Sequence, residues 1–479
     1  MQIAPHGITR KAVFERLAEF RQNDLKWREG RTFGYIFDPG QAILDVGKDA
    51  YTEFLSENGL DFTAFGSLLH LERELAAYLA GHLRGDGQVV GNFSSGGTES
   101  IILAVKAARD RYREKRPDIK DPEMVLSTTT HAAFHKAAHY LGVKAVTVSV
   151  DPKTFRADVE NVRAAITDNT IMIVGSAPSY AHGVVDPIVD LAGLALRRDL
   201  WMHVDACMGG FLLPYFRRVG QPVPDFDFSV PGVTSISVDL HKYAYTPKGA
   251  SLILYRNKDF RRHQIFACSR WVGYTIVNNA VQSSRSGGPM AAAWAVLNTI
   301  GDDGYLEIAR KKVAAVKKIT EGIDRIDGLR MLARPDMCLI SFTSDQVNVF
   351  QIVDEMNRRG WYVQPAFSFD NSPAHIHLSI NANNLGREDE LLRNLAESIA
   401  IARDMPDGEL IGMVKESLAG MDATTLSEKD ILGLLSAARI KAGALPGRMA
   451  DINSVLDKLS APVREKIFTV VVNEMFSQP

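Results

Sequence analysis

The chain has 479 residues, 46% hydrophobic and 23% charged, a balance typical of a globular protein that buries a large core. Its 55 Lys and Arg residues nearly balance 57 Asp and Glu residues, which argues against a nucleic-acid partner. Three widely spaced cysteines favour a reducing compartment over a disulfide framework. Residues 1–20 carry frequent charges, and no apolar run is long enough to span a bilayer. We therefore expect a cytoplasmic protein without a stable membrane anchor.

The chain opens with a predicted N-terminal segment, in which one helix (Lys11–Arg21) precedes irregular connecting chain. Short β-rich runs then alternate with helical stretches, which indicates βαβ units around a mostly parallel sheet. The strand candidates are Met124–Ser127, Ala145–Val150, Ile171–Gly175, Trp201–Val204 and Ser235–Val238. The helix candidates are Ala132–Leu141, Asp158–Ile166 and Ile188–Arg197. Sheets of this kind bind ligands beyond the carboxyl ends of their strands.

The pattern changes after about Gly301. A long helix is predicted over Tyr305–Ile326, followed by strands near Leu339–Phe342 and Ile376–Ile380. From Asp404 onward the chain is predicted to be a helical tail that ends in an apolar stretch, Ile467–Phe476. We expect an N-terminal segment (1–60), a large α/β domain (61–300) and a smaller C-terminal α+β domain with a helical tail (301–479).

The first chemical motif is a Ser/Gly/Thr-rich turn, Gly-Asn-Phe-Ser-Ser-Gly-Gly-Thr-Glu-Ser (91–100), which opens the helical run Ile101–Arg111. Free backbone N–H groups and the positive end of the helix dipole suit a phosphate at such a turn. The motif has neither the Gly-Lys of a nucleotide P-loop nor the spacing of a hydrolase nucleophile elbow. The alternative is a simple helix cap at Ser95 or Thr98.

The second motif is the apolar strand Trp201–Val204, which ends in Asp205. A buried carboxylate at a strand end needs a partner, because an unpaired buried charge is unfavourable. The protonated pyridine nitrogen of pyridoxal 5′-phosphate (PLP) is one such partner, and the pairing turns the ring into an electron sink. The alternative is an aspartate that caps the following helix.

The third motif follows the strand Ser235–Val238, where His241 and Lys242 enter a loop. A lysine at the end of a sheet can form an imine with a cofactor aldehyde, and His241 is within reach of a cofactor phosphate. Most lysines are merely solvated charges. The order of a phosphate turn, a strand-end aspartate and a His-Lys pair favours the cofactor interpretation for Lys242.

A fourth motif contains three histidines, His131, His135 and His139, spaced to lie on one face of a helix. Paired histidines can bind zinc, but the glutamate of His-Glu-x-x-His is absent and no third ligand is apparent, so we expect no metal site. A flat imidazole stacked on the cofactor ring is the better interpretation of His131. The other two histidines are interpreted as structural.

In this order, the motifs resemble those of the group II PLP-dependent decarboxylases and, within them, the sphingosine-1-phosphate lyases. The resemblance runs from about Gly59 into the tail. It implies an aminotransferase-like (fold type I) α/β fold with PLP as cofactor. The shared pieces are Ser-Gly-Gly-Thr-Glu-Ser (95–100), His-Ala-Ala-Phe-x-Lys-Ala-Ala (131–138), Gly-Ser-Ala-Pro (175–178), His-Val-Asp-Ala-Cys-x-Gly-Gly-Phe (203–211), Asp-x-His-Lys-Tyr-x-Tyr-x-Pro-Lys-Gly (239–249) and Ser-Arg-x-Gly-Gly (284–288).

Carried over residue by residue, the resemblance implies a complete cofactor site. The cofactor phosphate would be bound by Gly97, Thr98 and His241. The cofactor ring would be stacked by His131, paired at its nitrogen by Asp205 and held as a Schiff base by Lys242. The neighbouring subunit would lend Ser284 to the phosphate, which implies a homodimer with shared active sites.

The resemblance also bears on the substrate. In the lyases, a lysine six residues past the Schiff-base lysine contacts the substrate phosphate, and here that residue is Lys248; the alternative is an exposed loop lysine. The lyases carry Gly-x-Val-Tyr, and the matching stretch here, Phe33–Phe37, has phenylalanine at the position of that tyrosine. Tyr35 lies two residues earlier, on the same face of an extended chain, so we expect it to assist proton transfer instead. They carry Asn-Pro-Leu-His where this chain has Asn58 to Asp61. Asn58 is expected to bind substrate, while an aspartate replaces the phosphate-binding histidine.

The orientation of the bound amine decides which bond breaks. Breaking Cα–Cβ of a β-hydroxy amine gives an aldehyde and a smaller amine, whereas loss of a carboxylate is decarboxylation. We expect the carbon–carbon lyase, acting on a phosphorylated long-chain amino alcohol and releasing phosphoethanolamine. The alternatives are an L-amino-acid decarboxylase, an aminotransferase, for which no arginine clamp can be placed, and a non-catalytic PLP-binding protein.

Overall fold

The computed structural model describes residues 3, 5–406, 427–437 and 448–477. Its centre is a seven-stranded sheet in the order β1-β7-β6-β5-β4-β2-β3. Neighbouring strands from β6 to β3 are parallel, and β7 runs against both of its neighbours, so the predicted mostly parallel sheet is confirmed. The strands are β1 (Val90–Ser94), β2 (Glu123–Ser127), β3 (Lys144–Val148), β4 (Thr170–Ser176), β5 (Trp201–Asp205), β6 (Val233–Asp239) and β7 (Ser251–Tyr255).

Five of these strands match the predicted ones to within two residues. Four of them, β2, β4, β5 and β6, are short apolar runs buried on both faces, whereas β3 is a more exposed strand at the edge of the sheet. β1 and β7 were not predicted. β1 lies inside the Ser/Gly-rich motif, and β7 follows the His-Lys loop as an antiparallel neighbour of β6. Pairing with the rest of the sheet, rather than a local pattern, makes these segments strands.

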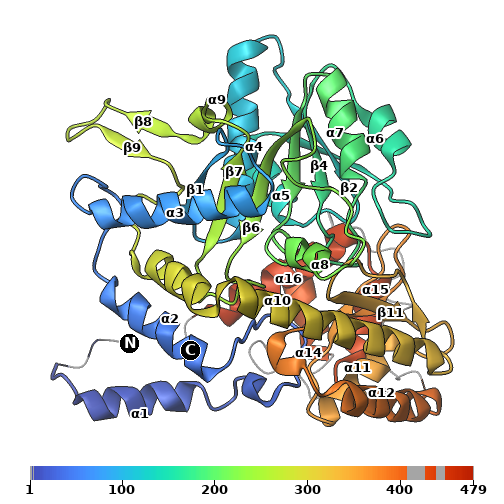
Figure 1. Cartoon of the computed structure of the whole chain (residues 1–479). Helices are drawn as coiled ribbons and strands as arrows, with labels where there is room; N and C mark the ends of the chain where they lie inside the picture. Colours follow the sequence, from blue (N-terminus) through green and yellow to red (C-terminus); the bar gives the residue numbers. More distant parts are fainter. Residues whose placement is uncertain (1–2, 4, 407–426, 438–447, 478–479) are drawn as a thin grey trace.

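Helices cover both faces of this sheet (Figure 1). On one face, α4 and α5 pack with residues such as Met124 and Leu126; on the other, α3, α7, α8 and α10 pack with residues such as Val125. This alternation is the period of two expected of a strand buried on both sides. The helices are α3 (Gly66–His82), α4 (Gly97–Lys115), α5 (Ala133–Leu141), α6 (Val159–Ala165), α7 (Ile188–Arg197), α8 (Leu213–Arg218), α9 (Lys258–Arg261) and α10 (Gly288–Arg325).

A second, antiparallel sheet in the order β10-β11-β13-β12 forms with α11 and α12 the smaller α+β part of the chain, as predicted. The predicted helix Tyr305–Ile326 is the second half of α10, whose first half is broken off at Gly301 (φ 64°). The domain division at residues 60 and 300 stays a prediction. The elements are β10 (Arg330–Met331), β11 (Leu339–Thr343), α11 (Val349–Arg358), β12 (Gln364–Ala366), β13 (His375–Ser379) and α12 (Glu388–Arg403).

The remaining elements are short or terminal. A hairpin of β8 (Phe266–Cys268) and β9 (Ile276–Asn278) projects beside β1 (Figure 1). Three 3₁₀ turns and three helices near the C-terminus also belong to the described chain. No helix among the described residues is long and apolar enough to cross a membrane. Predicted tail residues 407–426 and 438–447 lie outside the described residues. The elements are η1 (Trp27–Glu29), η2 (Arg262–Gln264), η3 (Ala382–Asn384), α14 (Glu428–Ala437), α15 (Ala450–Lys458) and α16 (Ala461–Met475).

The N-terminal segment departs from the prediction. The helix α1 (Arg10–Phe20) is present, capped by the hydroxyl of Thr9, but the chain that follows is not all irregular: α2 spans Gln41–Glu53. A Cβ at Gly47, the one buried residue of α2, would lie 3.2 Å from Pro247 and from Val296 in α10. Close packing against α10 thus stabilises a helix whose central glycine weakens its local signal.

One buried cation gives a stability prediction. Lys312, in α10, is fully buried and forms no ion pair with a carboxylate among the described residues. Its Nζ donates to the carbonyl oxygen of Ile380 and lies 4.4 Å from the centroid of the Tyr243 ring. Burial lowers the pKa of Lys312 from 10.5 to about 8.

Between about pH 8 and 10.5, the unfolded chain therefore binds more protons at this lysine than the folded chain does, so the free energy of unfolding should rise with pH. We expect Lys312→Met to remove this part of the rise, whereas Lys317→Met, at an exposed lysine of the same helix, should retain it. Urea unfolding across this pH range measures the slope. Equal slopes in the two variants would contradict the prediction.

Candidate active site

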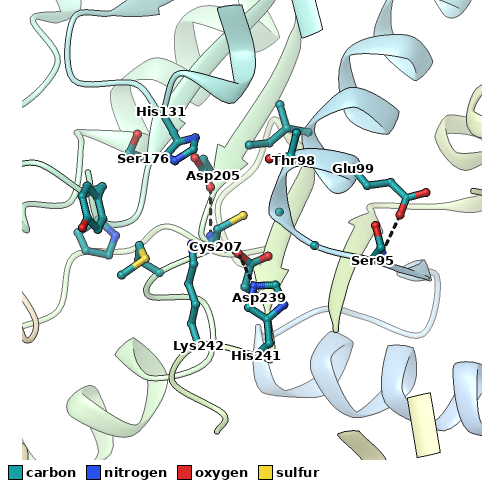
Figure 2. A pocket seen from close by; sticks show the side chains of 16 residues that line it. Ser95, Thr98, Glu99, His131, Ser176, Asp205, Cys207, Asp239, His241 and Lys242 are labelled. Atoms are coloured by element: carbon teal, nitrogen blue, oxygen red, sulfur yellow. Dashed lines mark hydrogen bonds and ion pairs between the residues drawn. The ribbon is translucent and has the colours of Figure 1, made fainter. Parts of the chain in front are cut away.

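A cavity of about 390 Å³ lies where β4, β5 and β6 end and α4 begins. This is the sheet edge at which the sequence places the ligand. The structure brings six predicted residues together around it, and Figure 2 shows how the labelled side chains among them lie. These six are Gly97, Thr98, His131, Asp205, His241 and Lys242.

The turn between β1 and α4 forms one wall of the cavity. The N–H groups in the first turn of α4 have no partner within the helix, and Gly97 leaves room above them. A Cβ at Gly97 would lie 2.7 Å from Oδ2 of Asp239 and 2.9 Å from Sγ of Cys207. The side chain of Glu99 braces the turn by accepting from the N–H groups of Ser95 (2.7 Å) and of Val281 (2.6 Å). The result is a rigid, open cradle suited to a phosphate.

Two buried aspartates stand at the ends of adjacent strands, Asp205 on β5 and Asp239 on β6. Oδ1 of Asp205 accepts from the backbone N–H of Cys207 (3.1 Å), and Ser237 Oγ lies 3.4 Å from it. Oδ2 of Asp239 lies 3.0 Å from Nζ of Lys242, while its Oδ1 is buried without a hydrogen-bond partner among the described residues. The cavity thus concentrates negative charge around one lysine.

Burial opposes the charge of Lys242, but Asp239, followed by Cys207 and Asp205, outweighs it and holds the pKa of the lysine above its ordinary value. Burial likewise acts to raise the pKa of Asp239, yet Lys242 and His241 lower it overall. The raised pKa of Lys242 and the lowered pKa of Asp239 both favour the charged form of the residue. The ion pair between Asp239 and Lys242 is the charge state that this site stabilises.

The two site histidines have assigned hydrogen bonds. Nδ1 of His131 accepts from the N–H of Ala133 (3.1 Å), and Nδ1 of His241 accepts from the N–H of Ala250 (3.2 Å). Burial lowers the pKa of His241, although Asp239 opposes this. The expectation of three histidines on one helix face was wrong for His131, which lies in the turn before α5. His135 and His139 are exposed on α5, which does not support the structural interpretation.

Four predicted residues do not line this cavity in their own chain. Nζ of Lys248 donates to the carbonyl oxygen of Tyr35 (2.9 Å) and lies 3.5 Å from the carbonyl oxygen of His241, a residue that lines the cavity. Asn58 Oδ1 accepts from the N–H of Leu60 and, weakly, of Arg285, so it braces a loop, and Ser284 is exposed on that loop. The backbone of Tyr35 is left-handed (φ 61°), so the expectation of an extended chain there was wrong.

The sequence reasoning missed two further groups. Asp239 carries the same signal as Asp205, an aspartate that ends a buried strand, and this signal was sufficient to find it. Tyr180 lines the cavity, and its hydroxyl donates to Oε1 of Gln364 (2.5 Å), whose Nε2 lies 3.5 Å from the hydroxyl of Tyr35. No local signal predicts this chain of contacts, because its members come from three distant segments.

The residues present fit PLP. The cradle at Gly97 has space and N–H donors for the phosphate, Asp205 is a buried carboxylate without an ion-pair partner among the described residues, and Lys242 supplies the amine. These are the three chemical functions by which proteins hold this cofactor.

The conserved domain of pyridoxal-dependent decarboxylases matches residues 56–345, and the C-terminal HTH domain of pyridoxal-dependent enzymes matches residues 412–474. The chain therefore belongs to the pyridoxal-dependent decarboxylase family, and its cofactor is PLP. At 18% identity, glutamate decarboxylase of Lactobacillus brevis shares the fold, with a TM-score of 0.74 over 85% of this chain and 96% of that one.

More similar proteins narrow the assignment. Sphingosine-1-phosphate lyase of Oryza sativa is 39% identical over 408 residues, 84% of this chain and 74% of that protein. The structure of sphingosine-1-phosphate lyase from Burkholderia pseudomallei is 35% identical and superposes with a TM-score of 0.80, covering 84% of this chain and 93% of that one. Within the decarboxylase family, the chain belongs with the sphingosine-1-phosphate lyases.

The cradle gives a test of cofactor binding. Gly97→Ala would place a methyl group against Asp239 and Cys207, so we expect at least tenfold weaker PLP affinity with an unchanged fold. Gly66→Ala, at the start of α3, is the matched control because a Cβ there meets nothing within 4 Å. Fluorescence titration with PLP and circular dichroism measure the two effects. Equal affinity in both variants would show that the cradle does not hold the phosphate.

Proposed function

We propose that this protein cleaves the Cα–Cβ bond of a phosphorylated long-chain amino alcohol such as sphingosine 1-phosphate, releasing a long-chain aldehyde and phosphoethanolamine. The observation that carries the proposal is Lys248, an ammonium that forms no ion pair with a carboxylate among the described residues and lies beside the candidate active site. A substrate phosphate supplies the charge that this lysine lacks. The similarity to sphingosine-1-phosphate lyases supports the same substrate class.

We propose that the cavity residues hold the cofactor as follows. When bound, PLP supplies an electron sink for the bond that breaks next to the amine. Lys242 provides the amine that anchors it, Asp205 pairs with the pyridine nitrogen, and His131 stacks on the ring. The N–H groups of Gly97 and Thr98, with His241, bind the phosphate.

The cleavage also requires that the β-hydroxyl lose a proton and that Cα gain one. We propose that Tyr180 is the group nearest this transfer, because it lines the cavity and its own proton points to Gln364. Its hydroxyl oxygen is therefore free to accept a hydrogen bond from the substrate. Tyr35 acts on it through Gln364. This pair takes the place of the tyrosine that the lyases carry at the position of Phe37.

The alternative function, decarboxylation of an L-amino acid, requires recognition of an α-carboxylate. No arginine is among the described residues that line the cavity. A guanidinium is the usual bidentate partner of a carboxylate, so its absence from this lining favours the phosphorylated amino alcohol.

We further propose a cytoplasmic homodimer with shared active sites. Ser284 is exposed and lies outside the cavity of its own chain, as expected of a residue that serves the partner subunit. It belongs to the same loop that Glu99 braces through Val281. Binding of the cofactor and assembly of the dimer would then depend on one loop.

The reaction is tested by mass spectrometry after PLP-loaded protein is incubated with sphingosine 1-phosphate. We expect phosphoethanolamine and a long-chain aldehyde in equal amounts. Lys242→Ala should form neither product, and it should lose the visible absorbance of the lysine-bound cofactor. No cleavage by demonstrably PLP-loaded wild type would sink the lyase proposal, and release of CO₂ from an amino acid would support the alternative.

Lys248 tests the substrate phosphate. Lys248 is an exposed residue, but partial desolvation by the surrounding protein, helped by nearby Lys242, lowers its pKa to about 8. In the free enzyme the lysine is thus charged below about pH 8 and neutral above it, so KM for the phosphorylated substrate should rise as pH passes 8. Lys248→Ala should raise KM at pH 7 at least tenfold and abolish this pH dependence, with PLP still bound.

Lys258→Ala, at an exposed lysine of α9, is the control and should match wild type. Steady-state kinetics from pH 6.5 to 9 would separate the variants. If Lys248→Ala keeps the KM of wild type, the lysine is a loop charge without a role in substrate binding.

A further inference from the structure

A second cavity lies at the opposite edge of the large sheet. It measures about 140 Å³ and opens where β5 and β6 begin, between α4, the end of α7 and α9. Trp201 starts β5 and lines it, whereas Asp205 ends the same strand in the active site. Four residue steps of strand separate the two sites by roughly 13 Å. The two cavities therefore share no lining residue.

Arg111, near the end of α4, contributes a guanidinium to this cavity. The guanidinium carbon lies 5.0 Å from the centroid of the Phe260 ring, and the side chain is 12% exposed. Nη1 is fully buried and has no hydrogen-bond partner in the described part of the chain. Asp199 is 3.9 Å from Nη2, but its side chain is 83% exposed and contributes little neutralising charge.

Arg256, after β7, contributes a second guanidinium. It donates to three carbonyl oxygens, those of Val233 (2.6 Å), Val230 (2.8 Å) and Phe228 (3.2 Å). Its partners are therefore neutral, and no carboxylate within the described ranges forms an ion pair with it. Burial lowers the pKa of Arg256 and so disfavours its positive charge, although Asp86 opposes this.

Two guanidinium groups thus line one small cavity with no buried carboxylate among its described lining residues. Arginine stays charged in proteins, and an anion bound from outside the chain would balance the two groups better than the exposed Asp199 does. The cavity has room for one small tetrahedral anion, and the Thr234 hydroxyl and Tyr112 lie in the same lining. Trp201 and Phe260 contribute aromatic walls to the cavity.

We propose that this cavity is a binding site for a single small oxyanion, of the chemical class of inorganic phosphate, held between Arg111 and Arg256. Planar guanidinium groups bind such anions through paired N–H donors, and Arg111 lines the cavity with an Nη1 that has no hydrogen-bond partner among the described residues. The site is separate from the reaction. The anion replaces a missing counter-charge between α4 and the beginning of β6 and so stabilises the folded chain.

The test is calorimetric titration of the PLP-loaded Lys248→Ala protein with inorganic phosphate at constant ionic strength. In this background neither the cofactor site nor Lys248 competes for the anion. We expect one phosphate per chain, bound at least tenfold more weakly after Arg111→Met. Arg116→Met removes an exposed arginine that pairs with Asp118 beside the end of the same helix, and it should leave the affinity unchanged.

Absence of phosphate binding, or equal affinity with and without Arg111, would overturn the site and leave the cavity to water. If Arg111→Met does not fold, Arg256→Met provides the same comparison. As an independent measurement, a crystal of the wild type soaked in selenate should show the selenium signal between the two arginines. Selenium found elsewhere, with this cavity lacking it, would also refute the proposal.

Discussion

The active site depends on two carboxylates that are buried at the ends of neighbouring strands. Asp205 and Asp239 lie on β5 and β6, which pair directly, so their charges face one cavity. A buried carboxylate without a partner is unfavourable by several kcal/mol in order of magnitude. Lys242, 3.0 Å from Asp239, is the cation that makes this arrangement stable. The charge of Lys242 and the charges of the two aspartates therefore stabilise one another within the same cavity.

The loop that carries Lys242 is held from the other side by the long helix α10. Tyr305 donates to the carbonyl oxygen of Ala244 (2.8 Å), and Lys312 lies over the ring of Tyr243. Lys312 also donates to the carbonyl oxygen of Ile380, which follows the small sheet. A single helix thus connects the loop of Lys242 to the C-terminal part of the chain. The position of the loop after β6 in the large sheet therefore depends on how α10 packs against the small sheet.

The contacts of Phe37 explain how a phenylalanine is accommodated where the lyases carry a tyrosine. The ring of Phe37 packs edge-on against Tyr243 (4.9 Å), and Nζ of Lys248 lies 4.9 Å from its centroid. Phe37 therefore supports two functional segments without offering a proton. A phenolic hydroxyl group reaches the cavity instead from Tyr180, which Gln364 of the small sheet connects to Tyr35.

The sequence by itself predicted the mostly parallel sheet, the Ser/Gly/Thr-rich turn, and Asp205 and Lys242 as site residues, because each rests on a local pattern: a buried apolar run, a helix start, or a residue at or soon after a strand end. Asp239 has the same local signal. Only the tertiary structure decided where α2, Tyr180, Gln364, Tyr35 and the Arg111–Arg256 cavity lie, because each depends on contacts between segments far apart in the chain. Strand order and helix packing set those contacts, and no short-range periodicity encodes them.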